Sequence, residues 1–155
     1  MLPRQHLIYG TLFTILFYII FPQTSLLFLF ILWLSTWFLI DLDHPIYFTI
    51  KYRSLNPVRF WQEFKMRKAW LKTLSLSKKR RYKSGIIIFH GIEFLIVLAI
   101  LSRIFVIFSY ILIGFVFHLL LDCIQLYKGK LDILTKVSLI YTLITNKKKR
   151  ELILK

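Results

Sequence analysis

The chain has 155 residues, of which 57% are hydrophobic and 17% aromatic. A soluble domain of this length could not bury so much apolar surface, so the composition excludes an ordinary soluble protein and predicts an integral membrane protein. The 22 lysines and arginines outnumber the 7 acidic residues and give a net charge of +15. This excess predicts anionic partners, with the headgroups of membrane lipids first among them, and no specific nucleic acid. The single cysteine, Cys123, excludes an internal disulfide and is interpreted as a small apolar filler.

Four apolar segments predict four membrane-spanning helices, at residues 7–21, 25–40, 85–101 and 104–121. Each is near or below the short end of the about 17–25 residues that a crossing helix needs. The links within the first pair and within the second pair are very short, so each pair predicts a helical hairpin. The predicted fold class is therefore all-α, a polytopic membrane four-helix bundle that forms a single domain over residues 1–155.

The basic residues indicate the orientation of this bundle. All lysines and arginines except Arg103 lie at the termini or in the long middle loop, residues 45–84. The positive-inside rule therefore predicts a multi-pass protein of the cell (inner or plasma) membrane, with both termini and the middle loop in the cytoplasm.

The middle loop and the tail each contain a further predicted helix. The loop reads NPVRFWQEFKMRKAWLKTL from Asn56, a plausible N-cap, and its apolar stripe and basic flanks predict an amphipathic helix in the membrane interface. The sequence KKRR at 78–81 adds a patch for anionic lipid, although both features can serve only to anchor and orient the protein. In the cytoplasmic tail, 123–155, we expect a surface helix at 131–145, because a crossing would carry the following KKKR outward.

Acidic residues and histidines gather at three predicted helix ends, all of them cytoplasmic. They are Asp41, Asp43 and His44 after the second apolar segment, His90 and Glu93 at the start of the third, and His118 and Asp122 at the end of the fourth. Spacings of three and four residues place each of the last two pairs on one helix face. We therefore expect all seven side chains to meet at one depth. His6 has no partner nearby in sequence and is left out of this set.

Carboxylates and imidazoles in a low-dielectric site need a cation to hold them together, which predicts a divalent metal. Zinc is favoured, manganese or iron would also suit the oxygen-rich set, and seven candidates leave room for one or two ions. Glu93 and Asp43 are the candidates for catalytic roles, while Lys51, Arg53 and Arg59 are candidates for binding a phosphate or headgroup. A single such residue at a helix end is usually only hydrogen-bonded or snorkelling, but a set at one depth favours a site.

Three short motifs carry a resemblance. Asp-Leu-Asp-His-Pro after a hydrophobic helix, a histidine at the start of the next hairpin, and Phe-His-Leu-Leu-Leu-Asp at its end resemble the LexA-regulated, inner-membrane metal-dependent hydrolase family, over about residues 25–125. The resemblance implies metal binding by Asp41, Asp43, His44, His118 and Asp122, and hydrolysis by analogy with zinc phospholipases. The middle motif departs from the family's His-Arg-x-x-Thr-His-Ser, since this chain has only His-Gly-Ile-Glu, in which the glutamate would replace a ligand or act as general base.

The predicted function is a membrane-embedded metal-dependent hydrolase of a phosphorylated or ester-linked lipid at the cytoplasmic interface. Two alternatives from other classes stay open. A metal-ion or proton carrier would need polar groups through the whole membrane, and the outer halves of the helices offer few. A non-enzymatic anchor with a basic loop for anionic partners would leave the acids and histidines unexplained.

Overall fold

The computed structural model describes residues 3–75, 78, 81–129 and 132–149, and the regular elements of this part of the chain are helices. The all-α prediction is confirmed. In chain order the elements are α1 (Pro3–Ile20), α2 (Leu26–Leu34), the π-helical turn η1 (Ser35–Leu39), the 3-10 turn η2 (Ile40–Leu42), α3 (Asp43–Tyr52), α4 (Pro57–Thr73), α6 (Ile92–Leu101), α7 (Val106–Lys128), α8 (Leu134–Val137) and α9 (Leu139–Asn146).

Two helices of the described chain are long and apolar enough to cross a membrane. One is the continuous helical run Leu26–Tyr52, which joins α2 to α3 through the two turns, and the other is α7. The shorter helix α6 is also apolar but has only 10 residues. Length and composition therefore support a membrane protein.

The second apolar helix does not end at residue 40 as predicted. It continues through η1 and η2 into α3 and ends at Arg53, whose φ of 48° is the left-handed conformation common just past a helix C-terminus. Pro45 is tolerated because it lies in the first turn of α3, where a missing N–H costs least.

The third apolar helix begins later than predicted, because the segment before it bonds to side chains elsewhere. Asn146 accepts a hydrogen bond from the backbone N–H of Ser84 (3.0 Å) and donates one to its carbonyl (2.9 Å). The backbone N–H of Phe89 donates to the carboxylate of Asp43 (3.2 Å). His90 therefore lies in a turn before α6, and not on a helix face as expected.

The predicted loop helix is confirmed as α4. Asn56 accepts hydrogen bonds from two backbone N–H groups of its first turn, at 2.9 and 3.2 Å. In the tail, two short helices replace the single helix expected at 131–145, because Ser138 caps α9 by accepting from the backbone N–H of Tyr141 (3.2 Å). Part of the KKRR patch and the chain beyond residue 149 lie outside the described residues.

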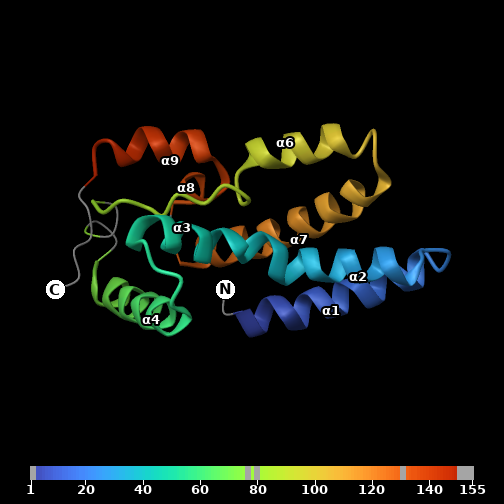
Figure 1. Cartoon of the computed structure of the whole chain (residues 1–155), viewed down its shortest axis with the longest axis horizontal. Helices are drawn as coiled ribbons and strands as arrows, with labels where there is room; N and C mark the ends of the chain where they lie inside the picture. Colours follow the sequence, from blue (N-terminus) through green and yellow to red (C-terminus); the bar gives the residue numbers. More distant parts are fainter. Residues whose placement is uncertain (1–2, 76–77, 79–80, 130–131, 150–155) are drawn as a thin grey trace.

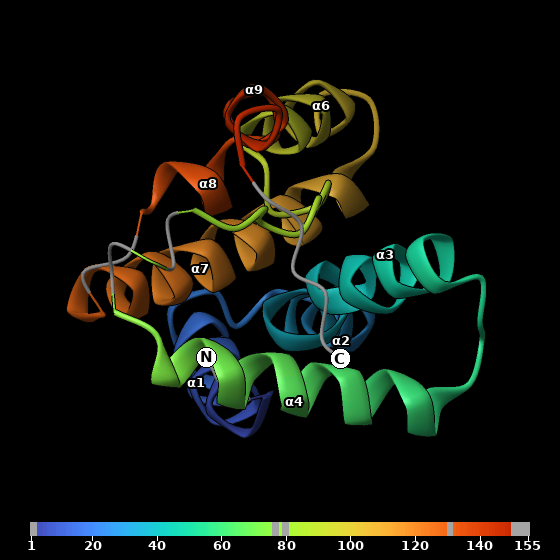
Figure 2. The ribbon, with the colours of Figure 1, turned by 90° about the vertical axis from the view of Figure 1, so that its left-hand side faces the viewer.

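Figure 1 shows the arrangement of the helices along the long axis of the molecule. The α1–α2 and α6–α7 connections lie at one end, and α3, α4, α8 and α9 gather at the other. Seen from that second end, α4 and α9 lie on opposite sides (Figure 2). Helix α7 contacts α1, α2, η1 and α6, and a buried core forms where Ile40, Leu98 and Phe115 meet.

Two glycines let α1 and α7 pack closely on the π turn. A Cβ at Gly114 of α7 would lie 2.5 Å from the Cβ of Ser35, and a Cβ at Gly10 of α1 would collide with the hydroxyl of Thr36. Ser35 and Thr36 are fully buried at this crossing. The π turn is thus held between α1 and α7. Each of these helices carries a histidine one turn from its glycine, His6 before Gly10 and His118 after Gly114.

Candidate metal centre

Seven side chains meet where α1, η2, α3, α7 and the turn before α6 come together. They are His6 from α1, Asp41 from η2, Asp43 and His44 from α3, His90 from the turn, and His118 and Asp122 from α7. Six of them belong to the set expected from sequence. His6 replaces Glu93 as the seventh.

Four ligand atoms face one another at the centre of this cluster. The Nε2 atom of His90 lies 3.5 Å from Oδ1 of Asp41 and 3.6 Å from Oδ2 of Asp122. The Nε2 atom of His118 lies 3.7 and 3.8 Å from the same two oxygens. Tetrahedral zinc with ligands at about 2.0–2.2 Å separates them by about 3.3–3.6 Å, so these four distances are close to the edges of a coordination tetrahedron.

Hydrogen bonds leave the lone pairs of both histidines directed at this centre. His118 donates from Nδ1 to the carbonyl of Thr36 (2.9 Å), and Nδ1 of His90 lies 2.9 Å from the carboxylate of Asp43. Carbonyl and carboxylate oxygens only accept, so each Nδ1 carries the proton and each neutral ring has its lone pair on Nε2. Both Nε2 atoms are buried without a hydrogen-bond partner among the described residues. Two lone pairs facing two carboxylates repel one another unless a cation lies between them.

Asp43 acts on His90 and is not one of the four central ligands. Its buried carboxylate accepts from the backbone N–H of Phe89 and from the ring of His90. Metal-binding histidines usually donate their second N–H to a carboxylate or a backbone carbonyl, and this arrangement fixes the ring. His90 with Asp43 shows the first of these patterns and His118 with Thr36 shows the second.

The protonation of His90 is sensitive to this environment. Three carboxylates surround its ring nitrogens, with Asp43 at Nδ1 and Asp41 and Asp122 facing Nε2. A proton on Nε2 would compete with a metal ion for the same lone pair.

His6 and His44 extend the centre on two sides. The ring of His6 stacks on His118, with centroids 3.9 Å apart and an interplanar angle of 5°, and its Nε2 lies 3.3 Å from Oδ1 of Asp122. His6, His118 and Asp122 offer ligand atoms within 4.8 Å of one another. Asp41, His44 and His90 form a second such group. The arrangement could therefore hold one central ion or two neighbouring ions.

Two further charged residues define the surroundings of the centre. The ammonium group of Lys136 in α8 lies 3.1 Å from Oδ2 of Asp122. Glu93 belongs to neither ligand group, because its carboxylate caps α9. It accepts from the hydroxyl of Ser138 (2.7 Å) and from the backbone N–H groups of Leu139 (3.0 Å) and Ile140 (3.1 Å). The structure therefore does not bring Glu93 to the centre, where the sequence had suggested a ligand or a general base.

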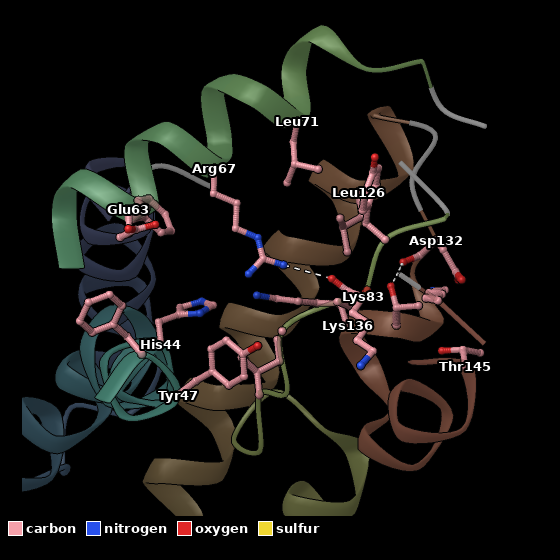
Figure 3. A pocket seen from close by; sticks show the side chains of 18 of the residues that line it. His44, Tyr47, Glu63, Arg67, Leu71, Lys83, Leu126, Asp132, Lys136 and Thr145 are labelled. Carbon is pink, nitrogen blue, oxygen red and sulfur yellow. Dashed lines mark hydrogen bonds between the residues drawn. The ribbon is translucent and has the colours of Figure 1, made fainter. Parts of the chain in front are cut away.

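A pocket of about 640 Å³ lies beside the centre and is shown in Figure 3. His44 joins the two, since it contacts Asp41 and also lines the pocket. The other described lining residues come mainly from α3, α4, α8, α9 and the segment 82–87. The basic ones are Arg67, Lys83, Lys136 and Lys149.

The three cations predicted to bind a phosphate are not among the described lining residues of this pocket. Two of them lie over an aromatic ring instead. The ammonium group of Lys51 lies 5.4 Å from the ring centroid of Tyr52, and the guanidinium of Arg59 lies 5.8 Å from it. Arg53 ends α3 in its left-handed conformation.

Comparisons of the chain with models of known protein families, with curated proteins and with solved structures gave no match. The resemblance to the LexA-regulated hydrolases rests on the short motifs alone and stays a prediction.

Proposed function

We propose that this chain is a membrane-embedded, zinc-dependent hydrolase that acts on a phosphorylated or ester-linked lipid from the cytoplasmic side. The observation that carries the proposal is the convergence of two buried imidazole lone pairs and two carboxylates at separations of 3.5–3.8 Å. The central ligands would be His90, His118, Asp41 and Asp122. The motif resemblance points to the same class of activity.

The residues around the centre would have different roles in hydrolysis. A divalent ion held there would lower the pKa of a bound water and stabilise the negative charge that develops on the ester. Asp43 and the carbonyl of Thr36 would hold the two ligating rings in place. His44 is about one-third exposed and lines the pocket, so its imidazole would accept the proton of the attacking water. His44, and not Glu93 as predicted from sequence, would therefore be the general base.

The lengths of the helices support a place for the centre inside the inner half of the membrane. At a rise of 1.5 Å per residue, α1 runs about 21 Å from Ile20 back to His6, and α7 runs about 18 Å from Val106 to His118. If the connections at that end of the molecule lie at the outer interface, the centre lies about two thirds of the way across a hydrocarbon core of about 30 Å. The pocket would then open from the centre towards the inner headgroups.

The surface of the helices supports the same setting. Large apolar side chains of α1 point outward, among them Ile8, Leu12 and Ile19 with exposed fractions of 58%, 58% and 69%. Exposed apolar surface of this kind is expected against lipid. We propose that α1, α2, α6 and α7 form the membrane bundle, with both termini in the cytoplasm and α4 in the inner interface.

Metal analysis of detergent-purified protein tests the proposal. We expect one or two zinc ions per chain in the wild type, and a loss of zinc in His118→Ala and Asp122→Ala. Glu93→Gln is the matched control, because it changes an acidic side chain outside the centre and should retain zinc. Equal and negligible metal in all four proteins would contradict a metal centre.

An activity measurement separates hydrolysis from transport. Zinc-loaded wild type should release product from a lipid phosphate or a lipid carboxylic ester, and His118→Ala should not. Zinc flux into liposomes without turnover of any lipid ester would instead favour the carrier.

A further inference from the structure

We propose that the pocket beside the centre binds the phosphate group of a lipid, with Lys136 and Arg67 as its phosphate-binding residues. The inference rests on the proposed function and narrows it, since it selects a lipid phosphate over a lipid that carries only carboxylic esters. It also assigns phosphate binding to Lys136 and Arg67 in place of Lys51, Arg53 and Arg59, the cations expected from sequence.

The charge of the pocket favours an anion. Four basic side chains are among its described lining residues, against two acidic ones, Glu63 and Asp132. Asp132 is occupied in local structure, since it accepts from the backbone N–H of Leu134 (3.1 Å). A phosphate group has several acceptor oxygens and can therefore accept from an ammonium and a guanidinium on two walls of one pocket.

Lys136 reaches from this pocket to the centre. Its ammonium group lies 3.1 Å from Oδ2 of Asp122, one of the four central ligand atoms, and it also lines the pocket. An anion bound to Lys136 would therefore lie beside the reacting atoms. The helix that carries Lys136 is tied to α9, because the hydroxyl of Thr142 donates to the carbonyl of Thr135 (2.7 Å). Helix α9 is in turn anchored by Glu93, which caps it at Ser138, and by Asn146, which binds the backbone of Ser84.

Arg67 approaches the pocket from the opposite element. Figure 3 shows its side chain reaching down from α4 into the pocket, where Nη2 donates to the carbonyl of Lys83 (3.1 Å). This bond holds the guanidinium in place and uses one of its five N–H donors. The planar group suits two parallel bonds to a phosphate.

The walls of the pocket favour a lipid over a free phosphate ion. Much of the described lining is aromatic or aliphatic, including Phe48, Phe60, Phe64, Leu71 and Ile87. A free ion would gain nothing from such walls, whereas glycerol and acyl carbons would bury apolar surface against them.

Binding to the full chain in detergent, with a chelator present so that no substrate is turned over, tests this inference. The probes are dioctanoyl phosphatidic acid, inorganic phosphate and dioctanoylglycerol. Lys136→Gln and Arg67→Gln should each weaken binding of the phosphatidic acid about tenfold, the loss of one charge-assisted hydrogen bond. Lys136→Arg should restore most of it. The matched control Lys51→Gln removes the same charge outside the pocket and should change binding less than twofold.

Three results would overturn the inference. Equal losses in all three glutamine variants would mean that only surface charge attracts the lipid. Dioctanoylglycerol bound as tightly as the phosphatidic acid would remove the role of the phosphate, and inorganic phosphate bound as tightly would remove the role of the apolar walls. Zinc content is measured in parallel on protein without chelator, so failure of the metal centre would show as absent zinc whatever the lipid binding shows.

Discussion

The substitution Asp43→Asn tests whether Asp43 positions the metal ligand His90 or is itself a metal ligand. The carboxylate of Asp43 bonds to the ring of His90 at 2.9 Å and accepts from the backbone N–H of Phe89 at 3.2 Å. The amide of asparagine has nearly the same shape and can still accept from His90, but it carries no charge. The substitution therefore exchanges a charge-assisted hydrogen bond for a neutral one and leaves the four central ligands intact.

The expected size of the effect follows from that exchange. Hydrogen bonds to charged groups contribute about 1.5–3 kcal/mol and neutral ones about 0.5–1.5, so about 1–1.5 kcal/mol is lost, which corresponds to roughly five- to thirteenfold weaker zinc binding. This is the lower end of the about 10–100-fold range seen when the partners of metal ligands are changed. Asp43→Ala removes the acceptor altogether and should cost about a hundredfold.

Competition with a chromophoric zinc chelator in detergent measures both effects. Glu93→Gln is the control, because it makes the same chemical change in a carboxylate that accepts three hydrogen bonds away from the centre. Zinc affinity equal to that of the wild type in Asp43→Asn and Asp43→Ala would refute the role of Asp43. A complete loss of zinc in Asp43→Asn would make it a ligand and not a positioning residue.

Three further predictions address pH, the α9 cap and the packing of α7. Because a proton on Nε2 of His90 or His118 competes with a metal ion for the same lone pair, zinc affinity should fall with decreasing pH, and a flat profile in chelator competition would contradict this. Glu93→Gln should lower stability by about 1 kcal/mol in thermal unfolding with zinc retained, whereas lost zinc would restore Glu93 as a ligand. Gly114→Ala should cost about 1–3 kcal/mol, because its Cβ would lie 2.5 Å from that of Ser35; an unchanged melting temperature would argue against that close packing.

The sequence was sufficient to predict the meeting of α7 with the end of the second apolar helix. His118 and Asp122 are four residues apart on one helix face, and the alternating directions of the apolar segments place Asp41 at the same depth as this pair. The cap at Asn56 likewise gave the start of α4. Both predictions depend on residues close together in the sequence, and both features are present in the structure.

The remaining features depend on contacts between distant segments. Glu93 has the spacing of a helix partner of His90, but tertiary bonds from α9 draw it away, and bonds from Asp43 hold His90 in a turn. In the sequence Lys136 is only one charge in an apolar stretch, because nothing local indicates that α8 lies against Asp122.

His6 did have a signal in the sequence. It lies four residues before Gly10, as His118 lies four residues after Gly114, so each histidine shares a helix face with a glycine that packs on the π turn. A search for histidines one turn from a glycine in apolar helices would have paired them.

The central claim is that imidazoles and carboxylates together hold a divalent ion in the inner half of the membrane. X-ray absorption spectroscopy at the zinc edge of the loaded, purified protein tests it most directly. We expect four or five nitrogen and oxygen ligands at about 2.0–2.2 Å with the scattering of two or more imidazole rings, reduced in His118→Ala. A spectrum of hydrated zinc without imidazole, or a protein that retains no zinc, would contradict the claim.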